Sequence, residues 1–127
     1  MLTMEDMRLA VAETIRKVRT QVQWKPGKDA VHLHKRQAMG HLPSAAGTSD
    51  YNAIIRSIVH DPEGMVFEYR FRGQVYVAVR STVVGRAWLA LFSLEGLMET
   101  AFPPDDIGDY LTQPGYTELG TIMELLK

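Results

Sequence analysis

The residues best suited to chemistry gather in one stretch of the sequence, positions 32–41. The stretch holds three imidazoles and two fixed cations, with no carboxylate among them: His32, His34, Lys35, Arg36 and His41. Imidazole is the side chain whose unperturbed pKa lets it take up and release a proton near neutral pH, and Lys and Arg bind phosphate. Metal-free cleavage of a phosphodiester would need such a set. A solvated basic loop has the same composition, and the sequence separates these two interpretations only weakly.

Metal binding is a competing chemistry for the same stretch. His32 and His34 lie two positions apart, so on an extended chain both side chains project to one side and could hold a zinc ion. A third ligand would have to be His41, His60 or a distant carboxylate, and no HExxH spacing supplies it. We therefore expect neither a metal nor another cofactor.

The elements that must position these residues follow from hydrophobic periodicity. Apolar residues recur at spacings of three and four from Met4 to Val22 and again from Tyr51 to Val59, which predicts helices over 3–23 and 50–61. Between them, residues 25–47 show no clear period, and we expect a basic, histidine-rich loop there. Helices are therefore expected on both sides of the candidate chemistry.

After residue 64 the period changes from helical to alternating. Residues 65–102 carry apolar side chains at every second position, broken by Gly73 and by Glu95-Gly96, which predicts an antiparallel sheet of about four strands. Residues 105–126 are expected to form a short helical tail. The order predicts a single α+β domain over 1–127, in which N-terminal helices pack on one face of an antiparallel meander and a short helix closes the chain.

Composition closes several functional classes. The chain has no cysteine, so it can form no disulfide, thiolate nucleophile or Cys-type zinc site. No apolar run approaches the roughly 18 residues of a membrane span, and no signal-peptide pattern opens the sequence, so we expect a cytoplasmic protein without a membrane partner. The net charge is −1, but residues 1–86 carry 13 Lys or Arg against 8 acidic residues, and residues 87–127 carry one against 7. This distribution predicts a basic working face and an acidic remainder.

From about Gly40 to Tyr116 the chain resembles the barnase–EndoU–colicin–RelE superfamily of small ribonucleases, and in particular its compact toxin-domain and phage-associated members. The resemblance lies in the order of elements and in three stretches, HKR…H, YVAV and ETAFPPD, which lie within 34–41, 76–79 and 99–105. Members of that superfamily typically cleave RNA without a metal, using His, Lys or Arg, and Thr or Ser side chains set on the sheet. The resemblance implies a metal-independent ribonuclease of toxin type.

The resemblance also assigns roles to individual residues. His41 is the first candidate for proton transfer, followed by His34 and Lys35 as a second proton carrier and a phosphate contact. Arg80 and Thr100 would hold the scissile phosphate. The remaining candidates are expected to bind RNA: Arg36, Arg70, Arg72 and Tyr76. For each residue a plain structural role stays open, such as a helix cap for His41 or a surface strand cation for Arg80.

Two non-enzymatic functions stay open as well. The same scaffold could be a protein-interaction module, in which the acidic C-terminal part binds a basic partner. It could also be a small-ligand-binding domain with Trp88 lining the pocket. For a toxin-type ribonuclease the expected partners are RNA and a neutralising or scaffold protein.

Overall fold

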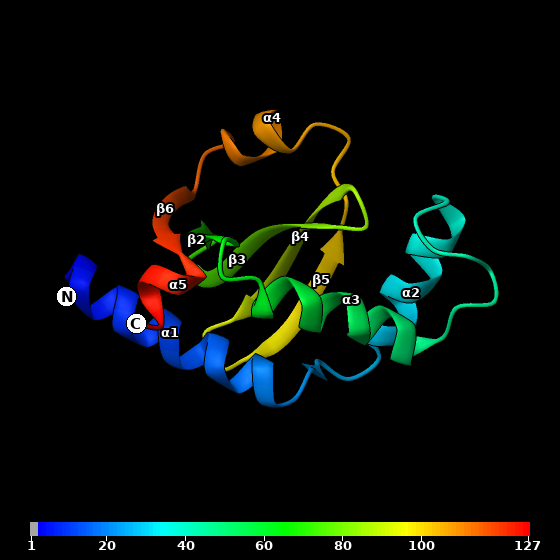
Figure 1. Ribbon diagram of the computed structural model, residues 1–127, viewed down its shortest axis with the longest axis horizontal. Helices are drawn as coiled ribbons and strands as arrows, with labels where there is room; N and C mark the ends of the chain where they lie inside the picture. The colour runs from blue at the N-terminus through cyan, green and yellow to red at the C-terminus, as the bar shows by residue number, and fades with distance from the viewer. Residues whose placement is uncertain (1–2) are drawn as a thin grey trace.

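The computed structural model describes residues 3–127, which form an α+β structure with five helices and a six-stranded mixed sheet (Figure 1). In chain order the elements are α1 (Met4–Thr20), β1 (Gln23–Trp24), α2 (Lys28–Ala38), α3 (Thr48–His60), β2 (Met65–Phe71), β3 (Gln74–Val83), β4 (Arg86–Ser93), β5 (Leu97–Phe102), α4 (Ile107–Leu111), β6 (Tyr116–Thr121) and α5 (Ile122–Leu125). The strands lie in the order β1-β5-β4-β3-β2-β6. The expected α+β class is therefore correct.

The long helices form where the periodicity predicts them. Helix α1 begins with a capping box, in which the Thr3 hydroxyl accepts from the Asp6 amide at 3.0 Å and the Asp6 carboxylate accepts from the Thr3 amide at 3.2 Å. Its buried stripe and that of α3 share one core: Met7, Val11, Ile15 and Val18 with Tyr51, Ile55, Ile58 and Val59. None of the helices within residues 3–127 combines the length and apolar character needed to cross a membrane.

The loop expected over 25–47 is wrong in its first half, because residues 28–38 form helix α2. This helix has no apolar stripe to reveal it, and Arg36 is its one buried side chain. It lies along the part of β5 that the short strand β1 leaves unpaired, rather than across a sheet face, so long polar side chains cover this edge instead of aliphatic ones. Gly27 starts the helix in the left-handed region (φ 79°), which glycine adopts readily.

The predicted meander is present as β2-β3-β4-β5, each strand antiparallel to the next, but the sheet is wider than four strands. The two-residue strand β1 pairs parallel with β5 and is too short to leave a period in the sequence. At the opposite edge β6 pairs with β2, so the tail expected to be helical over 105–126 contains a strand between two short helices. A bulge at Leu119 interrupts the alternation of β6 and hides it.

The sheet separates two unequal layers. We name the side packed against α1 and α3 the core face; it carries Val77, Val79, Ala90 and Phe92. The opposite side, the α4 face, buries the smaller cluster of Phe67, Ala78 and Leu89 under Ile107, Tyr110 and Leu111. Figure 1 shows α1 and α3 on one side of the sheet and α4 on the other. The expectation that the N-terminal helices lie on one face therefore holds for α1 and α3, whereas α2 lies along the edge of β5.

Beside β1, the edge of β5 is completed by a side chain instead of a strand. The buried Tyr51 hydroxyl donates to the Ala101 carbonyl and accepts from the Ala101 amide at 3.1 Å. These are the two backbone groups that a longer β1 would have paired. The contact fixes β5, and with it the strand residues of the candidate site, to α3.

Candidate functional site

Helix α2 presents three polar side chains at a spacing of four residues toward β5. Residues four apart lie on one face of a helix, so Lys28, His32 and Arg36 form a single row. Each reaches a residue of β5 on the α4 face: Lys28 reaches Glu99, His32 reaches Thr100, and Arg36 lies over the ring of Phe102. The seam between α2 and β5 is therefore lined by titratable groups along its length.

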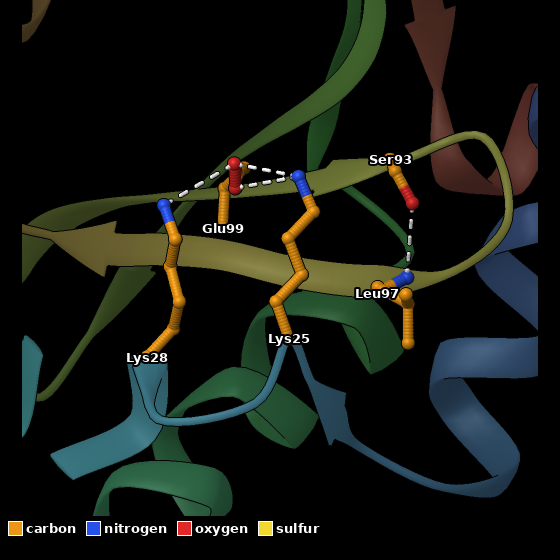
Figure 2. Close-up of polar contacts among 5 residues, drawn as sticks. All are labelled: Lys25, Lys28, Ser93, Leu97 and Glu99. Carbon is orange, nitrogen blue, oxygen red and sulfur yellow. Dashed lines mark hydrogen bonds and ion pairs between the residues drawn. The ribbon is translucent and has the colours of Figure 1, made fainter.

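A β-bulge positions the first of these contacts. Thr100 pairs with Leu91 and Met98 with Phe92, which leaves Glu99 as the extra residue of β5. Figure 2 shows Lys25 and Lys28 reaching toward the Glu99 carboxylate, with Nζ–O distances of 2.7 Å and 3.5 Å. Burial alone would raise the pKa of Glu99, but the hydrogen bond and charge of Lys25, joined by Lys28, bring that pKa below its ordinary value. Glu99 is thus an anion held between two cations.

The imidazole of His32 is held by a contact at one ring nitrogen and by another on one face of the ring. Its Nδ1 lies 3.1 Å from the Thr100 hydroxyl, and the indole of Trp24 stacks on it with ring centres 6.1 Å apart. Trp24 is held in turn, because its Nε1–H donates to the Asn52 side-chain oxygen at 2.8 Å. Burial, followed by the charges of Lys35, Lys28 and Arg36, lowers the pKa of His32 below 6.5. The imidazole is therefore neutral at pH 7 and held in one orientation.

Arg36 is buried without the partners that a buried guanidinium normally has. Its exposed fraction is 6%, and within residues 3–127 neither Nε nor Nη1 has a hydrogen-bond partner. The remaining nitrogen, Nη2, lies 3.7 Å from the thioether sulfur of Met39, a weak acceptor. The guanidinium borders a cavity of about 370 Å³, whose wall also includes Phe102 and Tyr110. Unpaired buried N–H groups are costly, so the guanidinium favours a ligand that accepts hydrogen bonds, although Asp105, Asp106 and Asp109 on the wall of the same cavity repel an anion.

The end of α2 places His41 beside Arg36. Gly40 takes a left-handed conformation (φ 75°), its amide donates to the Gln37 carbonyl at 3.1 Å, and the His41 amide donates to the Arg36 carbonyl at 2.8 Å. These two bonds form a Schellman motif, for which glycine is the preferred residue. The Nδ1 atom of His41 is buried, and no described residue gives it a hydrogen-bond partner. Burial, followed by the charges of Arg36 and Arg86, lowers the pKa of His41 below 6.5, and Asp105 opposes the shift.

Together these contacts place one cation near two neutral imidazoles. The charge of Arg36 depresses the pKa of both His32 and His41, so both rings lie within its electrostatic reach. His32 is one helical turn before Arg36, and His41 is bonded to its backbone. His41 and Arg36 line the cavity, where an imidazole can exchange a proton and the guanidinium can hold an anion, whereas His32 packs between Trp24 and Thr100 one helical turn away.

The residues named from the sequence divide between this site and other surfaces. His41, Thr100 and Arg36 belong to it. His34 does not: a helix turns about 100° per residue, so two positions past His32 its side chain leaves the β5 side, and it is exposed. Lys35 is exposed and does not line the cavity, although its charge acts on His32.

The strand cations lie away from the pocket. Arg80 shares a row of the α4 face with Phe102, but Leu89 lies between them, so Arg80 is not brought to the site. Arg70 forms an ion pair with Glu68. Both residues lie on the same side of β2 as Val66, which is the side of the core face. Arg72 lies in the β2–β3 turn over the ring of Phe71.

Tyr76 lies on the α4 face of β3 with Lys25 Nζ 5.6 Å from its ring centre, so it adjoins the lysine pair rather than the cavity. The zinc site considered for His32 and His34 required an extended chain. Because both residues lie in helix α2, their side chains point to different sides of the helix and do not form such a site. Within residues 3–127 no group of three or more His, Cys, Asp or Glu side chains is arranged to hold a metal ion.

Sequence reasoning missed the roles of His32, Glu99 and Lys25. The spacing of Lys28, His32 and Arg36 carried a usable signal, since positions i, i+4 and i+8 coincide on a helix. Helices were predicted from the spacing of apolar residues, so a helix that carries a polar stripe and no apolar stripe is missed. The bulge that exposes Glu99 to both lysines left no signal in the sequence.

No family model, no curated protein and no solved structure gave a significant match to this chain.

Proposed function

We propose that this protein is a metal-independent ribonuclease that cleaves RNA in the cavity bounded by Arg36 and His41, with His32 and Thr100 beside it. The observation that carries the proposal is the buried guanidinium of Arg36, whose Nε and Nη1 have no partner within residues 3–127, near two imidazoles of lowered pKa. A phosphodiester supplies the anionic oxygens that the guanidinium lacks. The imidazoles supply the proton transfers, so no metal is required.

The reaction that fits these groups is attack by the RNA 2′-hydroxyl on the adjacent phosphorus. One imidazole takes the proton of the 2′-hydroxyl, the bond to the 5′-oxygen breaks, and the other imidazole gives that oxygen a proton. The products are a 2′,3′-cyclic phosphate and a free 5′-hydroxyl. Arg36 stabilises the charge that develops on the phosphoryl oxygens. Since the arriving phosphate is anionic, it raises the pKa of both imidazoles and allows one to enter the reaction protonated.

Thr100 and Glu99 act on His32 in this scheme. The Thr100 hydroxyl holds Nδ1, which directs the other ring nitrogen away from β5. Glu99 is held by Lys25 and Lys28, and its charge partly offsets the cations that lower the pKa of His32. We assign both as positioning residues.

The experiment is cleavage of a fluorescent RNA oligonucleotide with EDTA present, by the wild type and by single alanine variants. His32→Ala and His41→Ala are expected to lose about 10²-fold or more in kcat/KM, the usual contribution of a positioned acid or base. His34→Ala is the matched control: it removes an exposed imidazole from the same helix and is expected to keep full activity. A wild type inert toward RNA, or an equal loss in all three variants, would contradict the proposal.

A second candidate is the binding of a small ligand without chemistry. Asp105, Asp106 and Asp109 border the same cavity as Arg36. Three carboxylates repel a polyanion and favour a compact ligand that carries an anionic and a cationic group. This reading requires that small zwitterions raise the melting temperature of the wild type while RNA is neither bound nor cleaved.

A further inference from the structure

Three cavities meet at His41, and the proposed reaction uses one of them. Besides the cavity at Arg36, His41 borders one of about 250 Å³ that also includes Ile54 and Trp88, and one of about 500 Å³ that includes Pro103 and Pro104. Arg86 lines both of these further cavities. His41 therefore lies between a buried arginine on one side and an exposed arginine on the other.

Arg86 has a fixed backbone and an unpaired side chain. It is the first residue of β4 and follows a two-residue turn in which Val84 (φ 49°) and Gly85 (φ 75°) are both left-handed, as a tight hairpin requires. Within the part of the chain that the structure describes, none of the ion pairs and none of the side-chain hydrogen bonds involves Arg86. Its charge lowers the pKa of His41, so the guanidinium lies within electrostatic reach of that ring.

We propose that Arg86 forms a second phosphate subsite, which binds the phosphate adjoining the scissile one in single-stranded RNA. The inference rests on the proposed function, because it assumes that the scissile phosphate lies between Arg36 and His41. A strand that crosses His41 passes from the cavity of Arg36 into those of Arg86, and a polynucleotide presents a phosphate at every step. An exposed arginine beside such a path adds binding energy that a substrate with a single phosphate cannot use.

Asp105 limits the strength of this subsite. It borders the same 500 Å³ cavity as Arg86, and its charge opposes that of the two arginines at His41. Because a carboxylate and a guanidinium line the same cavity, we expect Arg86 to contribute a modest factor of about five in affinity, comparable to an exposed ion pair. The subsite selects for length of the substrate rather than for sequence.

The test compares two non-cleavable ligands, a 2′-O-methyl dinucleotide with one phosphate and a 2′-O-methyl tetranucleotide with three. Arg86→Gln is expected to weaken the tetranucleotide about fivefold and to leave the dinucleotide unchanged. It should also lower the slope of log K against log salt by about 0.7, the value for one phosphate contact on a single strand. Arg80→Gln is the matched control, an exposed strand arginine that lines neither cavity, and is expected to change nothing.

Equal effects of Arg86→Gln on both ligands, or no effect on either, would overturn the subsite. Because the ligands cannot be cleaved, the result is independent of catalysis. Length-dependent binding through Arg86 without cleavage of natural RNA would leave the subsite and refute the ribonuclease. Cleavage of natural RNA without length-dependent binding through Arg86 would support the ribonuclease and refute the subsite.

Discussion

Replacing Arg36 with methionine should make the protein more stable and remove its function. The substitution keeps an unbranched chain of similar length against Phe102 and removes the guanidinium whose Nε and Nη1 have no partners. A residue that serves the fold should cost stability when it is lost. A residue kept for a ligand, and unsatisfied without it, should cost stability while it is present.

The magnitude follows from two opposing contributions. Each buried and unpaired polar nitrogen costs about 1–3 kcal/mol, so removing two of them gains about 2–6 kcal/mol. The lost contact between the guanidinium and the Phe102 ring, with 5.6 Å to its centre, takes back about 1–2 kcal/mol. The two contributions leave Arg36→Met a net gain of about 0–5 kcal/mol in the free energy of unfolding, and each kcal/mol corresponds to about 4 °C in melting temperature for a domain of this size.

The assay is urea unfolding of the wild type and of Arg36→Met, each with and without inorganic phosphate. Phosphate should stabilise the wild type according to its affinity, by about 2.7 kcal/mol at a hundredfold excess over Kd, and should not stabilise the variant. Arg80→Met serves as the control, because Arg80 is exposed and should show neither effect. A variant less stable than the wild type by 1 kcal/mol or more, or an undiminished response to phosphate, would refute the reasoning.

Three further predictions concern residues that contact β5 or belong to it. The pKa of His32 lies below 6.5 in the folded state, so the unfolded chain takes up a proton at this residue first as pH falls. The contribution of His32 to the free energy of unfolding should therefore be fully present above pH 6.5 and decline below it. Urea titrations at several pH values should show a smaller decline for His32→Gln. Glu99→Gln removes a charge that raises the pKa of His32, so NMR titration should place that pKa lower still, with a loss of about 1 kcal/mol in stability after screening at this half-buried site. Tyr51→Phe leaves both backbone groups of Ala101 without their partner and should cost about 1–3 kcal/mol in urea unfolding, whereas an unchanged midpoint would show that water replaces the hydroxyl.

Periodicity predicted those elements that bury an apolar face. Helices α1 and α3 and the meander from β2 to β5 all pack aliphatic side chains at a regular spacing, and these parts were predictable. Helix α2 was not, because its role is to cover the edge of β5 with Lys28, His32 and Arg36. Strand β1 was not either, since two residues cannot show a period.

The sequence predicted which stretch holds the candidate site, but not which of its side chains face β5. The stretch with His32, Arg36 and His41 stood out in the sequence, but the division between facing and exposed side chains depended on its being helical. When the stretch was predicted to be a loop, His34 was a stronger candidate for proton transfer than His32. In the helix His32 contacts Thr100 and His34 is exposed, which reverses that order. The pairing with Thr100 joins positions 68 residues apart, which no local pattern can show.

The most direct test is the identity of the reaction product by mass spectrometry after the wild type has acted on a short RNA in EDTA. Attack by the 2′-hydroxyl, with His32 and His41 moving the protons, predicts fragments ending in a 2′,3′-cyclic phosphate, absent when His41→Ala replaces the wild type. Intact RNA after prolonged incubation with the wild type, or fragments bearing a 5′-phosphate and a free 3′-hydroxyl, would contradict it.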